Sequence, residues 1–344
     1  MKPRRVFVVV MATLAAAVGA NLAIGSFLRN YTTNLGYYLI ARKWKLLDRS
    51  KGPVDWLILG DSSCNQGVRP DVIERLQGDT ALNLCTTAQQ LVVEGAWQLQ
   101  EFIARHGAPN KGIVVVHVYD VWPTASNGRG GQWPRPPLHK GMALVPLPWG
   151  FWRELDPALQ FGDSQLKSMA MLRYMPGYAQ STTLRKWLLG PRSSIRAIRE
   201  RKIDEFGYMK VEQADPRRVK ADTKQHRKYA RKDRFSVSKL NRVGLDAIDE
   251  LAAQHGLPVF LALGPIDRAL VSAPSFNRLL LRRVRPKIET VCERSRATRC
   301  LFFDEPVVFS AELMTNSDHV VHEAAARYTE RLFQAIDRKA PPSP

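Results

Sequence analysis

The sequence predicts an α/β protein in which helices cover both faces of a five-stranded parallel sheet, preceded by one membrane-spanning helix. Short apolar segments alternate with amphipathic ones along much of the chain, as expected for buried parallel strands joined by helices. Residues 6–28 form a single long stretch without a charge. With 344 residues, 45% of them hydrophobic, the chain can bury a large core. A disordered, collagen-like or small disulfide-stapled protein is therefore excluded.

The N-terminus begins with a basic end, residues 1–5, followed by the uncharged stretch Val6 to Leu28. At about 1.5 Å of rise per residue, a helix of this length covers the roughly 30 Å of a bilayer core. The alternative is a cleaved signal peptide with a small-residue site at 18–20, which would leave a mature chain beginning at Asn21. We favour a retained anchor because the apolar run continues beyond that site. In both cases the basic end stays in the cytoplasm and the body is exported, to the periplasm or the extracellular side.

The strands of the sheet are expected after a polar and basic connector, residues 29–53. Each is a short apolar run of the kind found in buried parallel strands. The five segments are Val54 to Leu59, Thr80 to Leu84, Gly112 to Tyr119, Leu257 to Leu263 and Cys300 to Phe303.

The helices between these strands are predicted from amphipathic spacing. One begins at about Pro70, one runs from about Val92 to His106, and one precedes the fourth strand with Ser236 as its expected N-cap. A final helix is expected to bury one apolar face, made of Ala324, Ala325, Tyr328, Leu332 and Ile336.

The domain organisation follows from a long interruption between the third and fourth strands. Residues 54–122 and 236–338 supply the α/β domain, and a Pro-rich tail covers 339–344. Residues 123–235 are too many for a simple crossover, so we expect an insertion with its own structure. Its second half is strongly basic, and both a solvated helical face and a surface facing phospholipid or an acidic polymer fit that charge.

The net charge of +19 calls for an anionic partner or neighbourhood. Nucleic acid, phospholipid headgroups and acidic glycans are the candidates. Because an exported body does not meet nucleic acid, the bilayer and an acidic or neutral glycan are the expected partners.

The four cysteines would meet an oxidising compartment after export, where any of three pairings is open. Only Cys292 and Cys300 are close in sequence, and they form either a disulfide or two buried thiols.

The chemistry begins where the first strand ends. Gly60, Asp61 and Ser62 place a hydroxyl in the turn after a buried strand, at the carboxyl edge where open α/β sheets bind their ligands. His319 lies after the fifth strand and just before the final helix, in a loop that returns to the same edge. A serine nucleophile needs such a base within hydrogen-bond reach. Ser62 and His319 are therefore the candidate catalytic pair.

At these residues the sequence resembles the SGNH, or GDSL-type, hydrolase superfamily. Gly60-Asp61-Ser62 resembles its first block, and Asp318-His319 with residues 320–329 resembles its last block, His-Leu-Asn-x-x-Gly-Ala-x-x-Tyr-Thr. The spacing to Tyr328 selects His319 over His322. The anchor, basic body and long insertion look most like exported proteins that partner membrane-bound O-acyltransferases, such as the D-alanine transfer protein of teichoic acids and the acetylation proteins of alginate. The resemblance implies a flavodoxin-like α/β/α fold.

The sequence also departs from the family pattern. Residues 117–120 read His-Val-Tyr-Asp where the third block has an Asn that binds the oxyanion, and Cys85 replaces the second-block Gly. Asn316 stands where the family has the acid of the triad. Losing one oxyanion donor costs about 10² to 10³ in rate, so the pattern fits a slow enzyme or an inactive one.

Three functions are compatible with these residues. The favoured one is an acyl-ester enzyme, an O-acyltransferase or esterase, with Ser62 as nucleophile, His319 as base and the backbone N–H groups of Ser62 and Cys85 as oxyanion donors. The alternative is an inactive SGNH-like domain that binds a glycan or docks on a membrane O-acyltransferase. A metal site of His319 and His322 lacks a further ligand at suitable spacing, so no metal or cofactor is expected.

The group that orients His319 is the last expectation. Asp318 is adjacent to His319, and neighbouring side chains in an extended loop point to opposite sides, so Asn316 or a backbone carbonyl is preferred. Asp120 and Asp304 follow strands and are alternative acids, although turn capping explains them as well. We therefore predict a Ser62–His319 dyad whose activity rises when Asn316 is replaced by Asp.

Overall fold

The computed structural model describes residues 3–31, 35–88, 91–125, 142, 145, 163–179, 184–185, 188–190 and 203–339. Its helices are α1 (Pro3–Tyr31), α2 (Leu35–Arg49), α3 (Ser62–Gly67), α4 (Pro70–Gln77), α5 (Leu91–His106), α8 (Asp163–Tyr174), α9 (Pro176–Ala179), α12 (Pro216–Ala230), α13 (Lys239–Gln254), α14 (Arg268–Val271), α15 (Pro274–Leu279), η1 (Leu280–Val284), α16 (Arg285–Arg294), η2 (Ala311–Leu313) and α17 (His322–Lys339). Its strands are β1 (Trp56–Gly60), β2 (Ala81–Asn83), β3 (Gly112–His117), β4 (Val259–Leu263), β5 (Ile266–Asp267), β6 (Thr298–Leu301), β7 (Val308–Phe309), β8 (Met314–Asn316) and β9 (His319–Val320).

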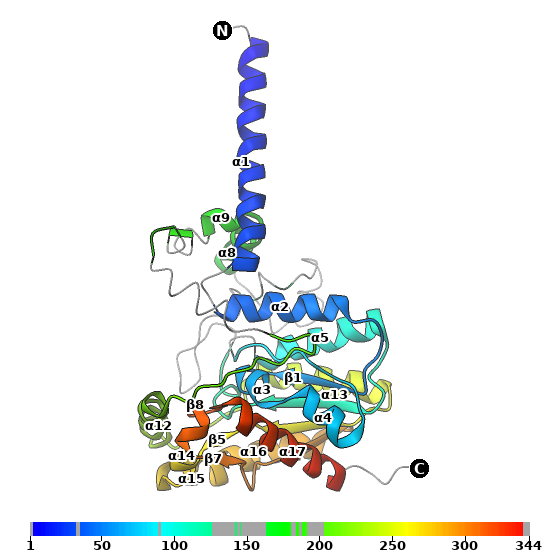
Figure 1. Ribbon diagram of the computed structural model, residues 1–344, viewed down its shortest axis with the longest axis vertical. Helices are drawn as coiled ribbons and strands as arrows, with labels where there is room; N and C mark the ends of the chain where they lie inside the picture. The colour runs from blue at the N-terminus through cyan, green and yellow to red at the C-terminus, as the bar shows by residue number, and fades with distance from the viewer. Residues whose placement is uncertain are drawn as a thin grey trace.

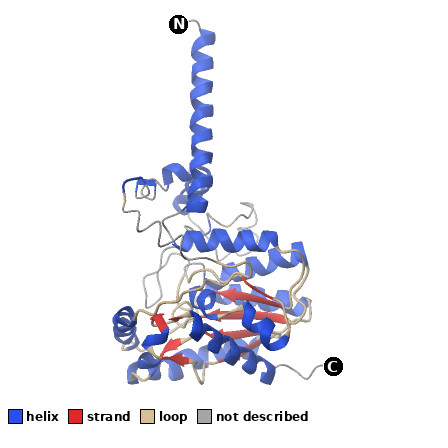
Figure 2. Cartoon of the chain, viewed as in Figure 1, coloured by secondary structure: helices blue, strands red, loops and turns tan. Residues whose placement is uncertain are grey.

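A five-stranded parallel sheet forms the centre of the body, with strand order β2-β1-β3-β4-β6 (Figure 2). This confirms the predicted α/β class and parallel sheet. The fifth strand runs over Thr298–Leu301 and not Cys300 to Phe303. The backbone of Phe302 has a φ of 66°, a left-handed conformation that cannot continue a strand, so the strand ends before it.

Helices cover both faces of this sheet. On one face, α5, α13 and α16 pack over the sheet in one hydrophobic cluster, and on the other, α3, α4 and α17 pack in a second (Figure 1). The predicted face of the final helix is buried in the second cluster. The predicted cap of α13 was wrong by two residues: Ser238, not Ser236, accepts the backbone N–H of Asn241.

The N-terminal helix α1 projects from one side of the body, with the N-terminus at its far end (Figure 1). Pro3–Phe27 is long enough to cross a membrane and has a mean hydropathy of 2.2. These properties suit both a retained span and a signal sequence.

The next helix, α2, is fixed to the body by buried polar contacts. The Lys43 ammonium donates to Asn83 at the end of β2, 2.8 Å from its carbonyl and 3.0 Å from its side-chain oxygen. Burial lowers the pKa of Lys43 well below its ordinary value. The Trp44 indole donates to Glu94 of α5 at 3.0 Å, and burial raises the pKa of Glu94 to about 7. The chain that follows α1 is thereby attached to the edge of the sheet.

Candidate functional site

The turn after β1 presents Ser62 at the carboxyl edge of the sheet. Gly60 adopts a φ of 148°, and a Cβ there would lie 2.0 Å from the carbonyl oxygen of Val116 on β3. Only glycine fits this close approach. Asp61 then caps α3, and Ser62 is the first residue of that helix, partly exposed.

Asp61 fixes this turn from inside. Its carboxylate accepts the Ser63 backbone N–H at 2.9 Å and the Ser63 hydroxyl at 2.6 Å through one oxygen. The other oxygen accepts the Val118 N–H at 2.9 Å and lies 3.5 Å from His117 Nδ1. Burial alone would raise the pKa of Asp61, but His117 and the hydrogen bonds of Ser63 and Val118 hold it well below its ordinary value. Asp61 therefore has a structural role, tying the Ser62 turn to the end of β3.

His319 lies in a small hairpin between the sheet and α17. Strands β8 and β9 pair in antiparallel fashion, with Asn316 opposite His319 and Ser317-Asp318 in the turn. His319 Nδ1 lies 2.7 Å from the Asn316 side-chain oxygen and is also hydrogen-bonded to the Asp318 carboxylate. With two acceptors around it, Nδ1 carries the proton, which leaves Nε2 able to accept one.

The charge of Asp318 changes the basicity of this ring. Burial favours the neutral ring, but the adjacent Asp318 carboxylate outweighs it and raises the pKa of His319. The Asp61 carboxylate contributes in the same direction.

The predicted dyad was wrong about the group that orients His319. Asn316 does contact Nδ1, as expected, but the Asp318 carboxylate contacts the same nitrogen. The alternation of side chains assumed an extended loop, whereas Asp318 lies in a tight turn, which brings adjacent side chains to the same side. His319 is thus hydrogen-bonded to a carboxylate as well as to the expected amide.

Ser62 and His319 lie on the same side of the molecule, because α3 packs against β9 and α17. No hydrogen bond joins the Ser62 hydroxyl to the His319 ring in the described part of the chain. Contacts between a nucleophile and its base are often longer before substrate binds. The structure thus brings the two residues into one region without a hydrogen bond between them.

The two predicted oxyanion donors, the backbone N–H groups of Cys85 and Ser62, differ in whether they are already hydrogen-bonded. The Cys85 N–H donates to the Asn83 side-chain oxygen at 3.0 Å, so it is already engaged. The Ser62 N–H, in the first turn of α3, has no acceptor within the residues that the structure describes. Of the two, only the Ser62 N–H is available to a developing oxyanion.

Both pairs of cysteines form disulfides. Cys292–Cys300 joins α16 to β6, and Cys64–Cys85 joins α3 to the segment after β2. The sequence analysis missed the second pair. Its signal was positional: Cys64 and Cys85 each follow a strand, and those two strands are neighbours in the sheet.

Helix α12 supplies further residues that the sequence analysis missed. Asp222 accepts from the Ser317 N–H at 3.1 Å and from the Ser317 hydroxyl at 2.7 Å, which holds the turn before His319. His226, one helical turn later, lies 3.7 Å from Asp222 and is hydrogen-bonded to the Tyr119 hydroxyl at 2.6 Å. The i,i+4 spacing of Asp222 and His226 indicated a pair on one helical face but not the contact with Ser317.

The remaining candidates lie apart from His319. Asp304 accepts the backbone N–H of Glu305 in an exposed turn, and buried Asp120 is not among the hydrogen-bond partners of His319. His322 pairs with the Tyr208 hydroxyl at 3.1 Å. Among the described residues, no group of three or more His, Cys, Asp or Glu side chains is placed to hold a metal ion.

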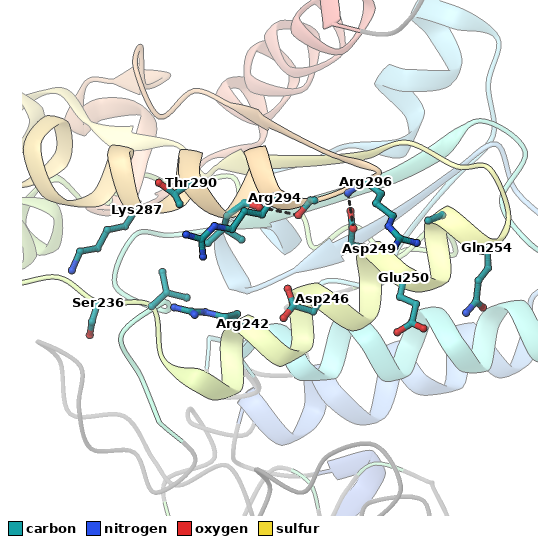
Figure 3. Close-up of a pocket in the computed structure, with 14 residues that line it drawn as sticks. Ser236, Arg242, Asp246, Asp249, Glu250, Gln254, Lys287, Thr290, Arg294 and Arg296 are labelled. Carbon is teal, nitrogen blue, oxygen red and sulfur yellow. Dashed lines mark hydrogen bonds between the residues drawn. The ribbon is translucent and has the colours of Figure 1, made fainter.

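A separate groove of about 800 Å³ lies between α13 and α16 (Figure 3). Arg242 and Lys287 line one part of it and Glu250 another. Asp249 in this groove accepts the backbone N–H groups of residues 296 and 297, both at 2.9 Å, and so anchors the start of β6. Neither Ser62 nor His319 lines the groove, so it is not part of the candidate site.

No protein-family model matches this chain, and no curated protein matches its sequence.

Proposed function

We propose that this protein is an exported, membrane-anchored acyl-ester enzyme, an O-acyltransferase or esterase, with Ser62 as nucleophile and His319 as base. The observation that carries the proposal is the environment of His319. Its Nδ1 is held by Asp318 and Asn316, and its turn adjoins the turn that presents Ser62. A carboxylate that orients the imidazole is one half of the arrangement in a serine hydrolase, in which the other ring nitrogen faces the nucleophile.

The proposed reaction has two steps. His319 Nε2 takes the Ser62 proton as Ser62 Oγ attacks the acyl carbonyl, and the same nitrogen then protonates the departing alcohol. The acyl group, now on Ser62, passes to a hydroxyl of the acceptor or to water, with His319 again removing the proton. The Ser62 N–H is the available donor to the oxyanion in both steps.

The substrate and partner in this proposal come from the resemblance of the sequence motifs. A cell-envelope or extracellular glycan is the acceptor or the ester substrate, and a membrane-bound O-acyltransferase is the partner. The apolar α1 and the net charge of +19 suit a body held near a membrane or an anionic polymer.

The alternative is an SGNH-like domain without catalytic activity that binds a glycan or docks on an acyltransferase. Two observations favour it: the Cys85 N–H is engaged by Asn83, and Ser62 is not hydrogen-bonded to His319. In that case the acyl group would be transferred entirely by the partner.

Labelling with a fluorophosphonate probe separates the two functions, because only an activated serine reacts. The full-length protein in detergent is expected to be labelled, and Ser62→Ala is expected to lose the label and about 10³-fold or more of any acyl-ester turnover. Ser272→Ala is the matched control, since Ser272 is an exposed serine whose hydroxyl donates to the Arg268 carbonyl and is assigned no role in the reaction. Absence of label on the folded wild-type protein, or equal turnover by Ser62→Ala, would favour the inactive domain.

A further inference from the structure

Two short helices from the segment between β3 and α12 lie beside the lower part of α1 (Figure 1). These are α8 and α9, which we call the α8–α9 hairpin, residues 163–179. Asn21 of α1 joins them by donating from Nδ2 to the Tyr174 carbonyl at 2.6 Å. Its Oδ1 accepts the backbone N–H of Gly177 at 3.3 Å. One amide side chain thus satisfies polar backbone groups at the link between the two helices.

The contact is also close in packing terms. A Cβ on Gly25 would lie 2.5 Å from the Pro176 ring, and one on Gly177 would lie 3.3 Å from the Ile24 side chain. Small residues on both sides therefore let the backbones of α1 and α9 approach, as they do where helices cross in membranes. Gly19, one to two turns earlier on α1, has nothing within 4 Å of its Cβ position.

The position of this contact along α1 sets its depth in a bilayer. Counting about 20 residues of hydrocarbon core from Val6 reaches Gly25. Asn21 and Gly25 then lie at the end of the span nearest the body, where the hydrocarbon gives way to headgroups. A polar side chain that bonds to backbone groups is suited to that level, because unpaired polar groups are costly in hydrocarbon.

The hairpin exposes the kinds of side chain that occur at a membrane surface. Tyr174 is 56% exposed and Met175 is 47% exposed, at the link between α8 and α9. Lys167 of α8 is also exposed. Aromatic and basic residues are enriched at this level of membrane proteins, where an apolar body meets charged headgroups.

We propose that the α8–α9 hairpin rests on the surface of the bilayer, with Tyr174 and Met175 inserted at the headgroup level of the leaflet that faces the body. The inference rests on the membrane anchor in the proposed function. It assigns the lipid bilayer as the partner of this surface. The span and the hairpin would together fix the height of the body over the membrane. The basic helix α12, by contrast, lies at the lower left of the body in this view, away from α1, so we expect it not to reach lipid (Figure 1).

Depth-dependent quenching tests the proposal on the full-length protein in lipid nanodiscs. All four native cysteines are in disulfides, so a single new cysteine can carry an environment-sensitive fluorophore. Met175→Cys is expected to be quenched at least about twofold more by lipid with a nitroxide near the headgroup than by lipid with one deep in the acyl chain. Leu14→Cys, in mid-span, is expected to show the opposite order. Lys228→Cys on α12 is expected to be quenched by neither.

The three labelled positions distinguish a failure of the hairpin proposal from a failure of the membrane anchor. Quenching at Leu14 without quenching at Met175 would overturn the hairpin proposal and leave the anchor intact, as expected if a membrane protein covers this surface instead. Absence of quenching at both positions would reject the anchor itself. Labelling of Ser62 by fluorophosphonate is independent of both outcomes.

A pair of glycine variants tests whether α1 holds the hairpin in place. Gly25→Val would collide with Pro176, so it is expected to reduce quenching at Met175→Cys by half or more while Leu14→Cys is unchanged. Gly19→Val adds the same side chain in open space on α1 and is expected to change neither signal. Equal effects of the two variants would show that the Gly25 contact does not position the hairpin.

Discussion

The two turns that form the candidate site are held in different ways. The Ser62 turn is fixed by the sheet itself, through Gly60 against β3, Asp61 bonded to Val118, and the Cys64–Cys85 disulfide. The His319 turn is a small hairpin outside the main sheet, held by Asp222 of α12. The nucleophile is thus part of the α/β core, whereas the placement of the base depends on a helix from residues 123–235. Helix α12 is therefore part of the candidate site.

The largest expected difference between the turns is in stability, and Asp61→Ala measures it. Removing this buried carboxylate leaves the Ser63 and Val118 N–H groups without acceptors, so unfolding is expected to become about 3–5 kcal/mol easier. Chemical denaturation of the detergent-solubilised protein gives the value. A loss under 1 kcal/mol would mean that Asp61 does not hold the Ser62 turn.

The depressed pKa of Asp61 gives this prediction a pH signature. Its contribution to stability is fully present above the unfolded value of about 4 and is lost as the pH falls through the lower folded value. The wild-type protein is therefore expected to lose stability below about pH 4 more steeply than Asp61→Ala. Parallel curves would contradict the assigned cause.

In the other turn, Asp318→Asn is expected to act on catalysis more than on stability. The variant keeps an acceptor near Nδ1 but removes the charge that stabilises the imidazolium, so kcat is expected to fall about 10²-fold or more. The pKa of His319 is raised by this carboxylate. The pH–activity curve should therefore have a rising limb, where the ring loses its proton, with its midpoint above about pH 6.5. Without Asp318 the limb is expected to move to lower pH.

The pH profile of kcat/KM separates this role from simple damage to the fold. A purely structural loss would lower activity at every pH and leave the limb in place. A limb that does not move in Asp318→Asn would reject Asp318 as the group that tunes His319.

A smaller effect is expected when the support from α12 is removed. Asp222→Ala releases the Ser317 N–H and hydroxyl, so the His319 turn loses about 1–3 kcal/mol of stabilisation and kcat is expected to fall about tenfold. Gln225→Ala, an exposed position on the same helix, is the control and is expected to change neither quantity. Equal activity of the two variants would show that α12 does not position the base.

The contrast between the Ser62 turn, fixed by the sheet, and the His319 turn, held by a helix distant in the sequence, also explains what the sequence could predict. The parallel sheet and the buried face of α17 follow from apolar runs and helical spacing, which are local signals. The contact of Asp318 with His319 depends on a tight turn between two very short strands, and the contact of Asp222 with Ser317 joins residues 95 positions apart. Neither leaves a periodic pattern in the sequence. The Cys64–Cys85 pair needed the strand order, which apolar runs alone do not define.

The smallest expected effect, and the sharpest test of how His319 is oriented, comes from Asn316→Asp. In a dyad without an acid this change would raise activity. With Asp318 already on Nδ1, a second carboxylate raises the pKa of His319 further, because more negative charge favours the imidazolium. Turnover near pH 7 is therefore expected to fall by less than about tenfold and to recover at higher pH, where the ring is neutral again. The double variant Asn316→Asp with Asp318→Asn moves the single carboxylate to the other acceptor position and is expected to regain much of what Asp318→Asn loses. If Asn316→Asp alone increases turnover near pH 7, Asp318 is not the acid and His319 works with Asn316 alone.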